Sequence, residues 1–198
     1  MKGIFISLLL CICLNMSGQP HKLSYGSIAL TNLHTDFPFG SFSSLVTKEY
    51  HPGFEIGTGF SWQAKEKHEW FQAFRFGYSY HRFVQHSISL YSEFGYRYRF
   101  LKSFSAESSL GAGYLHAIPD VDVFVLKPDG TYKKKTNLGH PQAMACLSVG
   151  VDKKITSGGT TIFLNYQQRL QFPFIKSYVP LLPSNLVMLG VTFKLKTK

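Results

Sequence analysis

Apolar and polar side chains alternate with a period of two along most of this chain. The segment 70–80 puts Trp70 and Phe74 on one side, whereas Ala73 and Arg75 lie on the other. Because successive side chains of a strand point to opposite faces, this segment predicts a strand with one apolar face and one small or charged face. An α-helix would mix both sets around its circumference, so the spacing favours a sheet.

Seven further segments repeat this alternation with varying strength: 25–33, 54–62, 88–100, 104–114, 143–152, 161–172 and 187–195. The first is the weakest, and we include it because a closed antiparallel sheet of this kind has an even number of strands. The connections are mostly longer at 34–53, 81–87, 117–141 and 173–185, and shorter at 64–68, 101–103 and 154–159. This pattern predicts an all-β fold, an eight-stranded antiparallel up-and-down transmembrane β-barrel with short periplasmic turns and longer extracellular loops.

Alternation alone fits both a soluble lipocalin-like barrel, which encloses its apolar face, and a membrane barrel, which turns that face to lipid. The polar faces collect three acids and four bases that nearly cancel: Glu55, Glu93, Glu107, Arg75, Arg97, Arg99 and Arg169. Such a balance is expected of an ion-pair network where water is scarce. Because eight strands leave an interior just wide enough for side chains, we predict a lumen filled by this network.

Aromatic side chains gather at both ends of the predicted strands. Those at the short-turn ends are Trp62, Trp70, Tyr98, Phe100, Phe104 and Phe193, and those toward the long loops are Phe54, Tyr80, Tyr114 and Phe172. Two aromatic girdles that bracket an apolar band are typical of a protein that crosses two membrane–water interfaces. The girdles therefore favour lipid on the outside of the barrel.

The first 18 residues have the pattern of a secretory signal peptide. Lys2 gives a positive start, residues 4–16 are almost wholly apolar, and the small residues Ser17 and Gly18 follow. An apolar stretch of about 13 residues is too short to span a bilayer as a helix. We therefore expect export and cleavage near Gly18, which leaves residues 19–198 as one outer-membrane β-barrel domain in the cell outer membrane.

Composition narrows the class further. Hydrophobic residues make up 44% of the chain and aromatic residues 16%, which excludes an intrinsically disordered protein. Of three cysteines, Cys11 and Cys13 lie in the predicted leader, so a disulfide scaffold is excluded as well. The formal charge of +10 is scattered along the chain, and this does not favour nucleic acid as a partner.

The chain resembles the small eight-stranded outer-membrane barrel proteins, particularly the outer-membrane β-barrel domain common in Bacteroidota. The resemblance rests on the leader, on the strand segment 94–98 (Phe-Gly-Tyr-Arg-Tyr) and on the closing segment 189–195 (Leu-Gly-Val-Thr-Phe-Lys-Leu). It implies contact with outer-membrane lipid and with the barrel-assembly machinery, which reads a terminal aromatic residue. Phe193 fits that position, although residues 194–198 follow it.

A search for catalytic residues is warranted because outer-membrane acyl hydrolases place a His and a Ser two residues apart on one strand face, where the imidazole can activate the hydroxyl. No histidine here has a serine at that offset, and the adjacent His86 and Ser87 point to opposite faces. We therefore predict no enzyme and no catalytic residue. A pair brought together from different strands remains an alternative.

No cofactor or metal site is predicted. His81 and His86 flank one short loop, but two polar residues in an exposed turn are the more common arrangement. Asp120, Asp122 and Asp129 lack the glycine and distal glutamate of a calcium loop. Cys146 falls on the inner face, where we expect a small filler and not a nucleophile.

The loop 117–141 is the most individual part of the chain. Its alternating valines lead into a predicted type I turn at 127–130, and its cationic residues are Lys127, Lys133, Lys134 and Lys135. We expect a hairpin that extends the barrel wall and displays a basic tip. This basic surface loop can bind lipopolysaccharide, surface polysaccharide or a protein partner through its charge, with lipid phosphates the favoured ligand among these. The more common role of such lysines is only to prevent aggregation of an exposed edge.

Together these features predict a non-enzymatic outer-membrane barrel with a side-chain-filled lumen and a structural or surface-interaction role. The alternatives are a lipid-modifying barrel enzyme, either an acyl hydrolase or an acyl transferase, and a soluble lipocalin-like carrier. Fold analogy supplies no specific protein partner.

Overall fold

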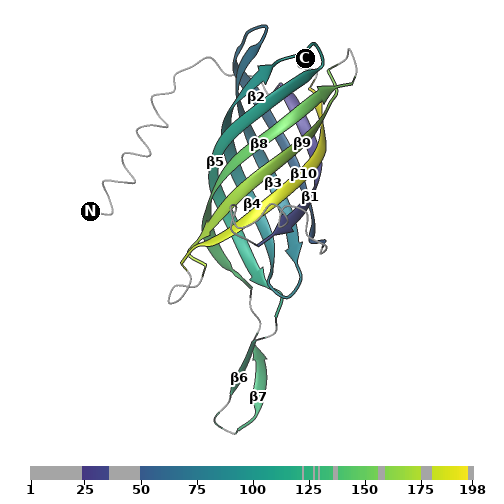
Figure 1. Ribbon diagram of the computed structural model, residues 1–198. Coiled ribbons are helices and arrows are strands. Elements are labelled where there is room, and N and C mark those ends of the chain that lie inside the picture. The colour runs from purple at the N-terminus through teal and green to yellow at the C-terminus, as the bar shows by residue number, and fades with distance from the viewer. Residues whose placement is uncertain are drawn as a thin grey trace, which may run out of the picture.

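The computed structural model describes residues 24–35, 50–121, 123–126, 128, 130–135, 138–155, 159–174 and 180–195. These residues form a closed barrel of eight antiparallel strands and a separate two-stranded sheet, which confirms the predicted fold (Figure 1). Within these ranges there is no helix long and apolar enough to cross a membrane. The predicted signal peptide lies outside the described residues.

The barrel strands follow an up-and-down order in which each pairs with its sequence neighbour. Their bounds are β1 (Tyr25–His34), β2 (Pro52–Ala64), β3 (His68–His81), β4 (Gln85–Arg99), β5 (Phe104–Pro119), β8 (His140–Lys154), β9 (Thr161–Phe172) and β10 (Leu182–Lys194). Pairing of β1 with β10 closes the sheet, so no barrel edge stays open. The hairpin strands β6 (Val123–Leu126) and β7 (Tyr132–Lys135) lie between β5 and β8 in sequence.

Several strands extend beyond the alternating segments. β5 continues to Pro119 and β8 starts at His140, because Ala117 still pairs with His140 across the ladder. The hydrogen bonds of a ladder join backbone groups, so a strand can continue through residues whose side chains do not alternate. The eight strands thus have 10 to 16 residues, enough to cross the apolar band of an outer-membrane barrel at a tilt.

The connection at 81–87, which the pattern grouped with the mostly longer ones, is a tight turn in the structure. His81 pairs with Gln85, so only Arg82, Phe83 and Val84 connect β3 to β4. Phe83 has a φ of 63°, a left-handed conformation that lets the chain reverse within this short turn. Sequence patterning missed the turn because no glycine or asparagine marks it.

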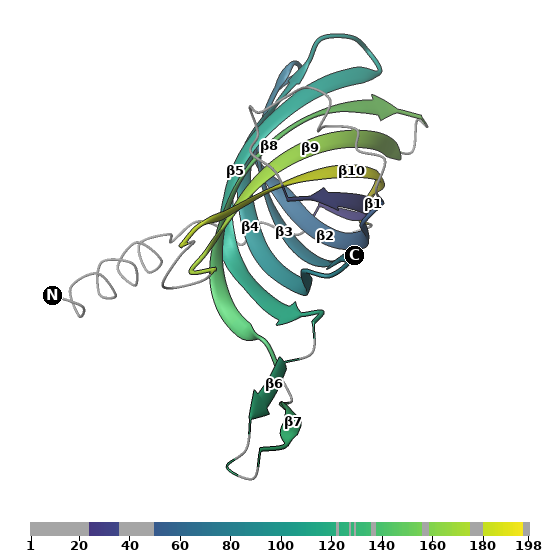
Figure 2. The same cartoon turned by 60° about the horizontal axis from the view of Figure 1, so that its bottom comes forward.

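The two ends of the barrel differ, and we name them for what they carry. At the turn end, β1 begins, β10 ends and short turns such as 65–67 and 100–103 connect neighbouring strands. At the hairpin end, β6 and β7 project away from the barrel as an arm, seen at the bottom of Figure 1 and again in Figure 2. Near the turn end the β2–β3 register shifts between Ser61 and Gln63, which makes a bulge at Trp62.

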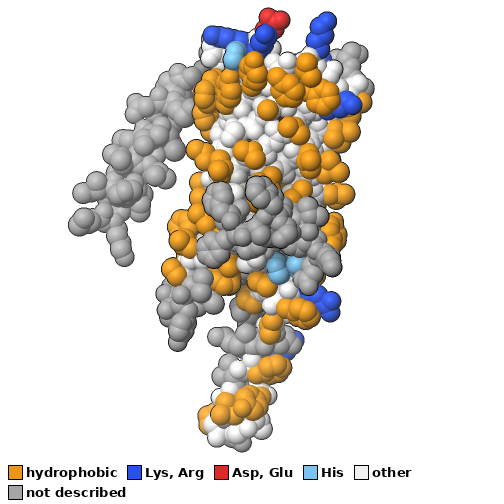
Figure 3. All heavy atoms as spheres, in the orientation of Figure 1, with side chains coloured by type: hydrophobic (Ala, Val, Ile, Leu, Met, Phe, Trp, Pro, Cys, Tyr) orange, Lys and Arg blue, Asp and Glu red, His pale blue; other side chains and the backbone are white. Residues whose placement is uncertain are grey.

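Apolar side chains of the barrel strands face outward. Leu30, Leu110 and Leu189 are 67%, 66% and 57% exposed, whereas Glu55 and Glu93 on the opposite face are 2% and 1% exposed. Hydrophobic side chains are spread over the visible face of the barrel in Figure 3. Lys and Arg side chains gather at the turn end, at the top of that view. This arrangement suits a lipid surround and is the reverse of a lipocalin-like carrier.

Inward-facing glycines give the larger lumen side chains their room. A Cβ on Gly95 would lie 2.5 Å from the ring of Phe71, and one on Gly111 would lie 2.7 Å from the sulfur of Cys146. Both distances are shorter than van der Waals contact, so a side chain at either position would displace the packed interior.

Candidate functional site

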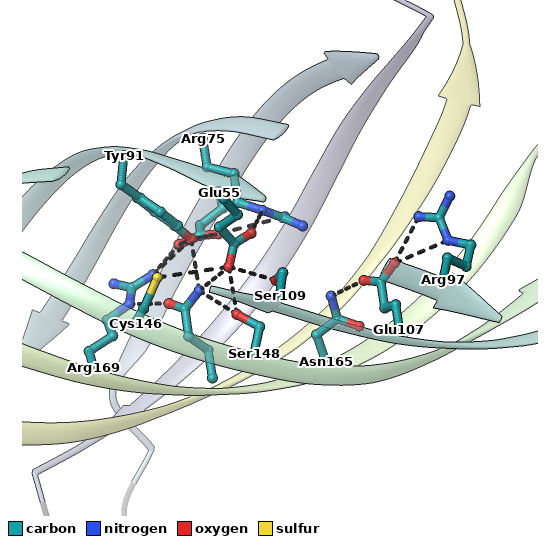
Figure 4. A network of polar contacts seen from close by, with 12 residues as sticks. Glu55, Arg75, Tyr91, Arg97, Glu107, Ser109, Cys146, Ser148, Asn165 and Arg169 are labelled. Carbon is teal, nitrogen blue, oxygen red and sulfur yellow. Dashed lines mark hydrogen bonds and ion pairs between the residues drawn. The ribbon is translucent and has the colours of Figure 1, made fainter. Parts of the chain in front are cut away.

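Two groups of ion pairs lie in the lumen, one near its middle and one toward the turn end. In the central group, Arg75 Nε donates to Glu93 Oε2 at 2.6 Å, and Arg169 pairs with Glu55. Tyr91 Oη donates to both carboxylate oxygens of Glu55 at 2.9 Å. These five side chains come from β2, β3, β4 and β9, so the group joins strands on different sides of the barrel (Figure 4).

The second group lies nearer the turn end and centres on Arg97. Its guanidinium contacts Glu107 at 2.7 Å, Asp152 at 2.8 Å and Glu69 at 3.5 Å. Arg99 also pairs with Glu69. Three carboxylates around one guanidinium satisfy its donors in several directions, which is what a buried charge requires.

Polar neutral side chains and inner aromatic rings complete both groups. The carboxylate of Glu93 accepts hydrogen bonds from Ser148 at 2.5 Å and from Gln167 at 2.9 Å. The Arg97 guanidinium lies 4.9 Å from the centroid of the Phe71 ring, close enough for a cation–π interaction. The lumen is therefore occupied by partnered charges and by the rings packed against them.

All seven charged residues predicted for the lumen face inward, but the structure divides them between the two groups. Sequence reasoning left out Glu69, Asp152, Tyr91 and Gln167. Tyr91 and Gln167 share the parity of the charged row, but a neutral side chain gave no charge signal. Glu69 has the same parity as Arg75 and would have been found by starting the predicted strand one residue earlier.

Apolar clusters lie beside the central group. One consists of Ala29, Leu33, Phe163, Leu186 and Met188, and the other of Tyr91, Leu115, Ala117, Met144 and Cys146. A cavity of about 10 Å³ is lined by residues of β1, β3, β4, β5, β9 and β10, which places it in the lumen at the hairpin end. That volume is hardly enough for one water molecule.

The predicted girdle residues of the turn end lie on the outer wall. Trp70, Tyr98, Phe100 and Phe193 are between 39% and 48% exposed, and Trp62 is half-buried in the bulge. Trp70 stacks on Phe94 with ring centroids 5.4 Å apart. Phe100 lies just beyond the end of β4 instead of inside it.

The basic surface loop differs from the expectation in two ways. The β6–β7 hairpin is a sheet of its own and does not continue the barrel wall. Lys133, Lys134 and Lys135 pair with Val125, Phe124 and Val123, so they lie along one strand of the arm and not at its turn. Lys127 lies outside the described residues. The lysines lie away from the turn because they form the second strand of the hairpin and pair there with the first strand.

At the hairpin end, Asp120 connects the segment that follows β5 to the turn between β3 and β4. Its carboxylate accepts a hydrogen bond from the Phe83 backbone N–H at 2.9 Å and one from Tyr80 Oη at 3.2 Å. The first of these bonds, more than any other contact, holds the pKa of Asp120 below its usual value. This contact fixes the left-handed turn at Phe83 against the loop that follows β5.

The same carboxylate belongs to a chain of three polar groups on the outer wall. His86 Nε2 lies 3.3 Å from Asp120 Oδ1, and His86 Nδ1 lies 2.8 Å from Tyr78 Oη. A hydroxyl, an imidazole and a carboxylate in series form a proton relay in principle. The hydroxyl is a phenol and comes from a different strand than the imidazole, so a search for His and Ser two residues apart could not have found it.

His81 and His86, which flank one turn, are not brought together. His81 stacks on His51 with ring centroids 3.8 Å apart, and the His51 ring is 5.6 Å from that of His34. In the described part of the chain, no three His, Cys, Asp or Glu side chains form a group able to hold a metal ion. Cys146 is buried with its sulfur 3.9 Å from Glu93.

No protein-family model and no curated protein sequence matches the chain. Among solved structures, the crystal structure of Neisserial surface protein A matches with a TM-score of 0.57 and 11% sequence identity, over 87% of this chain and 96% of that one. This is the fold of a small outer-membrane β-barrel. At this identity the likeness concerns the fold alone.

Two further matches have the same architecture at lower similarity. Ail, the attachment invasion locus protein of Yersinia pestis, matches with a TM-score of 0.46 and 12% identity, over 89% of this chain and 100% of that one. The outer membrane enzyme PagL matches with a TM-score of 0.48 and 11% identity, over 86% of this chain and 99% of that one.

Proposed function

We propose that this protein is a non-enzymatic outer-membrane barrel with a closed lumen and a structural or surface-interaction role. The observation that carries the proposal is the pair of ion-pair groups that join opposite walls of the lumen, together with the apolar clusters beside them. A barrel built for passage would keep its axis open to water. Here carboxylates and guanidinium groups neutralise each other across it.

The proposed location is the cell outer membrane, reached by export through a cleaved signal peptide at residues 1–18 and by the barrel-assembly machinery. The outward Phe193 near the end of β10 supports recognition by that machinery. We assign the turn end to the periplasm and the hairpin end to the cell exterior, because short turns face the periplasm in such barrels.

A closed lumen makes a direct prediction for planar bilayers. Purified protein inserted from detergent should give no steady open-channel current, since the two ion-pair groups join strands on different sides of the lumen. A variant in which Arg75, Glu93 and Arg169 are all replaced by alanine should give measurable current if it still folds, as judged by heat-modifiable gel mobility. Steady current through the wild-type barrel would contradict the proposal.

The hairpin arm is the proposed contact with lipopolysaccharide or another anionic surface. Lys133 and Lys134 are exposed on β7, and Phe124, Leu126 and Tyr132 are 56%, 58% and 71% exposed beside them. An isolated two-stranded hairpin with exposed apolar side chains is only marginally stable in water, so a contact surface would stabilise it. The lysines provide the complementary charge for lipid phosphates.

We expect the K133Q/K134Q variant to bind lipopolysaccharide vesicles more weakly than the wild type, with the difference disappearing at high salt because exposed charges are screened. Vesicle co-sedimentation of the detergent-free, liposome-inserted protein measures this. The matched control is K65Q/K67Q, which removes two exposed lysines at the turn end. Equal loss of binding in both variants would argue against a role for the hairpin.

A lipid-modifying enzyme is the second candidate, favoured by the Tyr78–His86–Asp120 relay on the outer wall. If the relay acts on lipid A, mass spectrometry should show altered acylation when the wild-type gene is expressed and an unaltered pattern with His86→Gln. An identical lipid A profile with and without the wild-type gene would dismiss this substrate class.

A further inference from the structure

The lumen opens at the turn end into a cavity of about 360 Å³, which we call the vestibule. Its lining includes residues from all eight barrel strands, from Tyr25 on β1 to Lys194 on β10. A cavity walled by the whole circumference is the mouth of the lumen and not a groove on the lipid-facing wall. Its volume lies within the range of small-molecule sites, roughly 300 to 1,000 Å³.

Positive charge dominates the lining of the vestibule. Two carboxylates, Glu69 and Asp152, face five cationic side chains: Arg97, Arg99, Lys102, Lys154 and Lys194. The formal excess of the lining is therefore three positive charges, and it is two when Glu107, which pairs with Arg97 below the lining, is included. This excess is a property of the mouth alone, because the central group deeper in the lumen pairs two acids with two arginines.

The arginines and the lysines of the vestibule differ in their partners. Both carboxylates are already engaged, since Asp152 pairs with Arg97 and Glu69 with Arg97 and Arg99. Over the described ranges, no ion pair involves any of the three lysines, whose side chains are exposed. The charge of the three lysines is thus available to a ligand. The two arginines line the inner end of the vestibule and are held there by their carboxylate partners.

The lysines approach the mouth from separate places on its rim. Lys102 lies in the turn after β4, Lys154 ends β8 and Lys194 ends β10. A Cβ placed on Gly159 would lie 2.7 to 2.9 Å from the Cγ, Cδ and Cε atoms of Lys194. The aliphatic part of Lys194 therefore rests against the Gly159 backbone, which holds this side chain beside the cavity.

Most of the remaining lining residues carry a hydroxyl group. Leu101 is its one aliphatic side chain larger than a methyl group, and the hydroxyl groups belong to Ser24, Tyr25, Ser61, Ser103, Ser105, Thr161 and Thr192. Hydroxyl donors and ammonium groups together match an oxygen-rich anion.

We propose that the vestibule is a binding site for a small hydrophilic anion whose charge is carried by phosphate groups. The cavity accommodates a molecule of the size of a sugar phosphate or a diphosphate, and the lysines supply the ammonium groups that bind phosphate as point charges. The site lies at the opposite end from the hairpin, so it can fail while the proposed surface role holds. Its phosphate can come from a soluble solute or from a phospholipid headgroup at the rim.

Calorimetry with inorganic pyrophosphate tests the site on the full chain, folded in zwitterionic detergent at low salt. We expect saturable binding that weakens as salt is added, and a loss of affinity of about tenfold or more in the K154Q/K194Q variant. The matched control, K65Q/K67Q, removes the same charge from two exposed lysines at the turn end that do not line the vestibule, and it should bind like the wild type. No binding to the wild type, or equal loss in both variants, would overturn the proposal.

A second pair of variants fills the cavity without changing its charge. These variants distinguish binding inside the vestibule from binding to the lysines of the rim alone. Ser105→Phe and Thr192→Phe each place a ring in the vestibule, and each should abolish pyrophosphate binding while heat-modifiable gel mobility reports a folded barrel. Undiminished binding in both folded variants would overturn the site. Nanodiscs identify the source: competition by phosphatidylglycerol discs but not phosphatidylcholine discs assigns the phosphate to a headgroup, and no competition assigns it to a solute.

Discussion

Arg169→Met is expected to destabilise the folded barrel by about 3–5 kcal/mol, because it leaves the buried carboxylate of Glu55 without its closest cation. Arg169 is 3% exposed and Glu55 is 2% exposed, so water cannot replace the lost partner. Arg75 lies 3.9 Å from Glu55 and already bonds to Glu93, which limits the compensation it can give. Urea unfolding in lipid vesicles, followed by tryptophan fluorescence, measures the change.

Two further variants separate charge from packing. Arg82→Met makes the same replacement at an exposed residue of the β3–β4 turn and should unfold close to the wild-type midpoint. Adding Glu55→Gln to Arg169→Met should recover much of the loss, because the double variant no longer buries an uncompensated charge. If the double variant were no more stable than the single one, the loss would reflect packing around Arg169.

Leu110→Arg is expected to cost about 2–4 kcal/mol in a bilayer, the penalty of a cation near the midplane on the lipid face of a barrel. Leu110 is 66% exposed and lies close to the middle of β5, so its side chain should meet hydrocarbon. In water the same change would be harmless or would improve solubility. Its sign therefore distinguishes a lipid surround from an aqueous one.

Leu138→Arg provides the control for this test. Leu138 is 79% exposed in the segment that precedes β8, beyond the barrel strands, where an arginine should cost little. Both variants are compared by urea unfolding in the same vesicles and by heat-modifiable gel mobility. Equal unfolding midpoints for the two variants, or a wild-type barrel that stays monodisperse in plain buffer, would refute the lipid assignment.

The period of two accounts for most of what could be predicted. It identified the eight barrel segments and assigned Phe74 to one face and Arg75 to the other, because parity along a strand is a local property. It could not locate the strand ends at Pro119 and His140, which depend on backbone pairing between distant segments. The bulge at Trp62 escaped for the same reason, whereas the turn at Phe83 escaped because no glycine or asparagine marks it.

By itself, the sequence determined the class of the fold and which side chains would face inward. Both follow from the alternation of side chains along each strand and from their charge, which are local properties of the sequence. Only the tertiary structure decided which acid meets which base: Glu55 and Arg169 lie 114 residues apart, and closure of the barrel brings them into contact. It also decided that three lysines from separate turns and strand ends surround one cavity. Such groupings depend on strand register and barrel closure, which fix distances that no local pattern records.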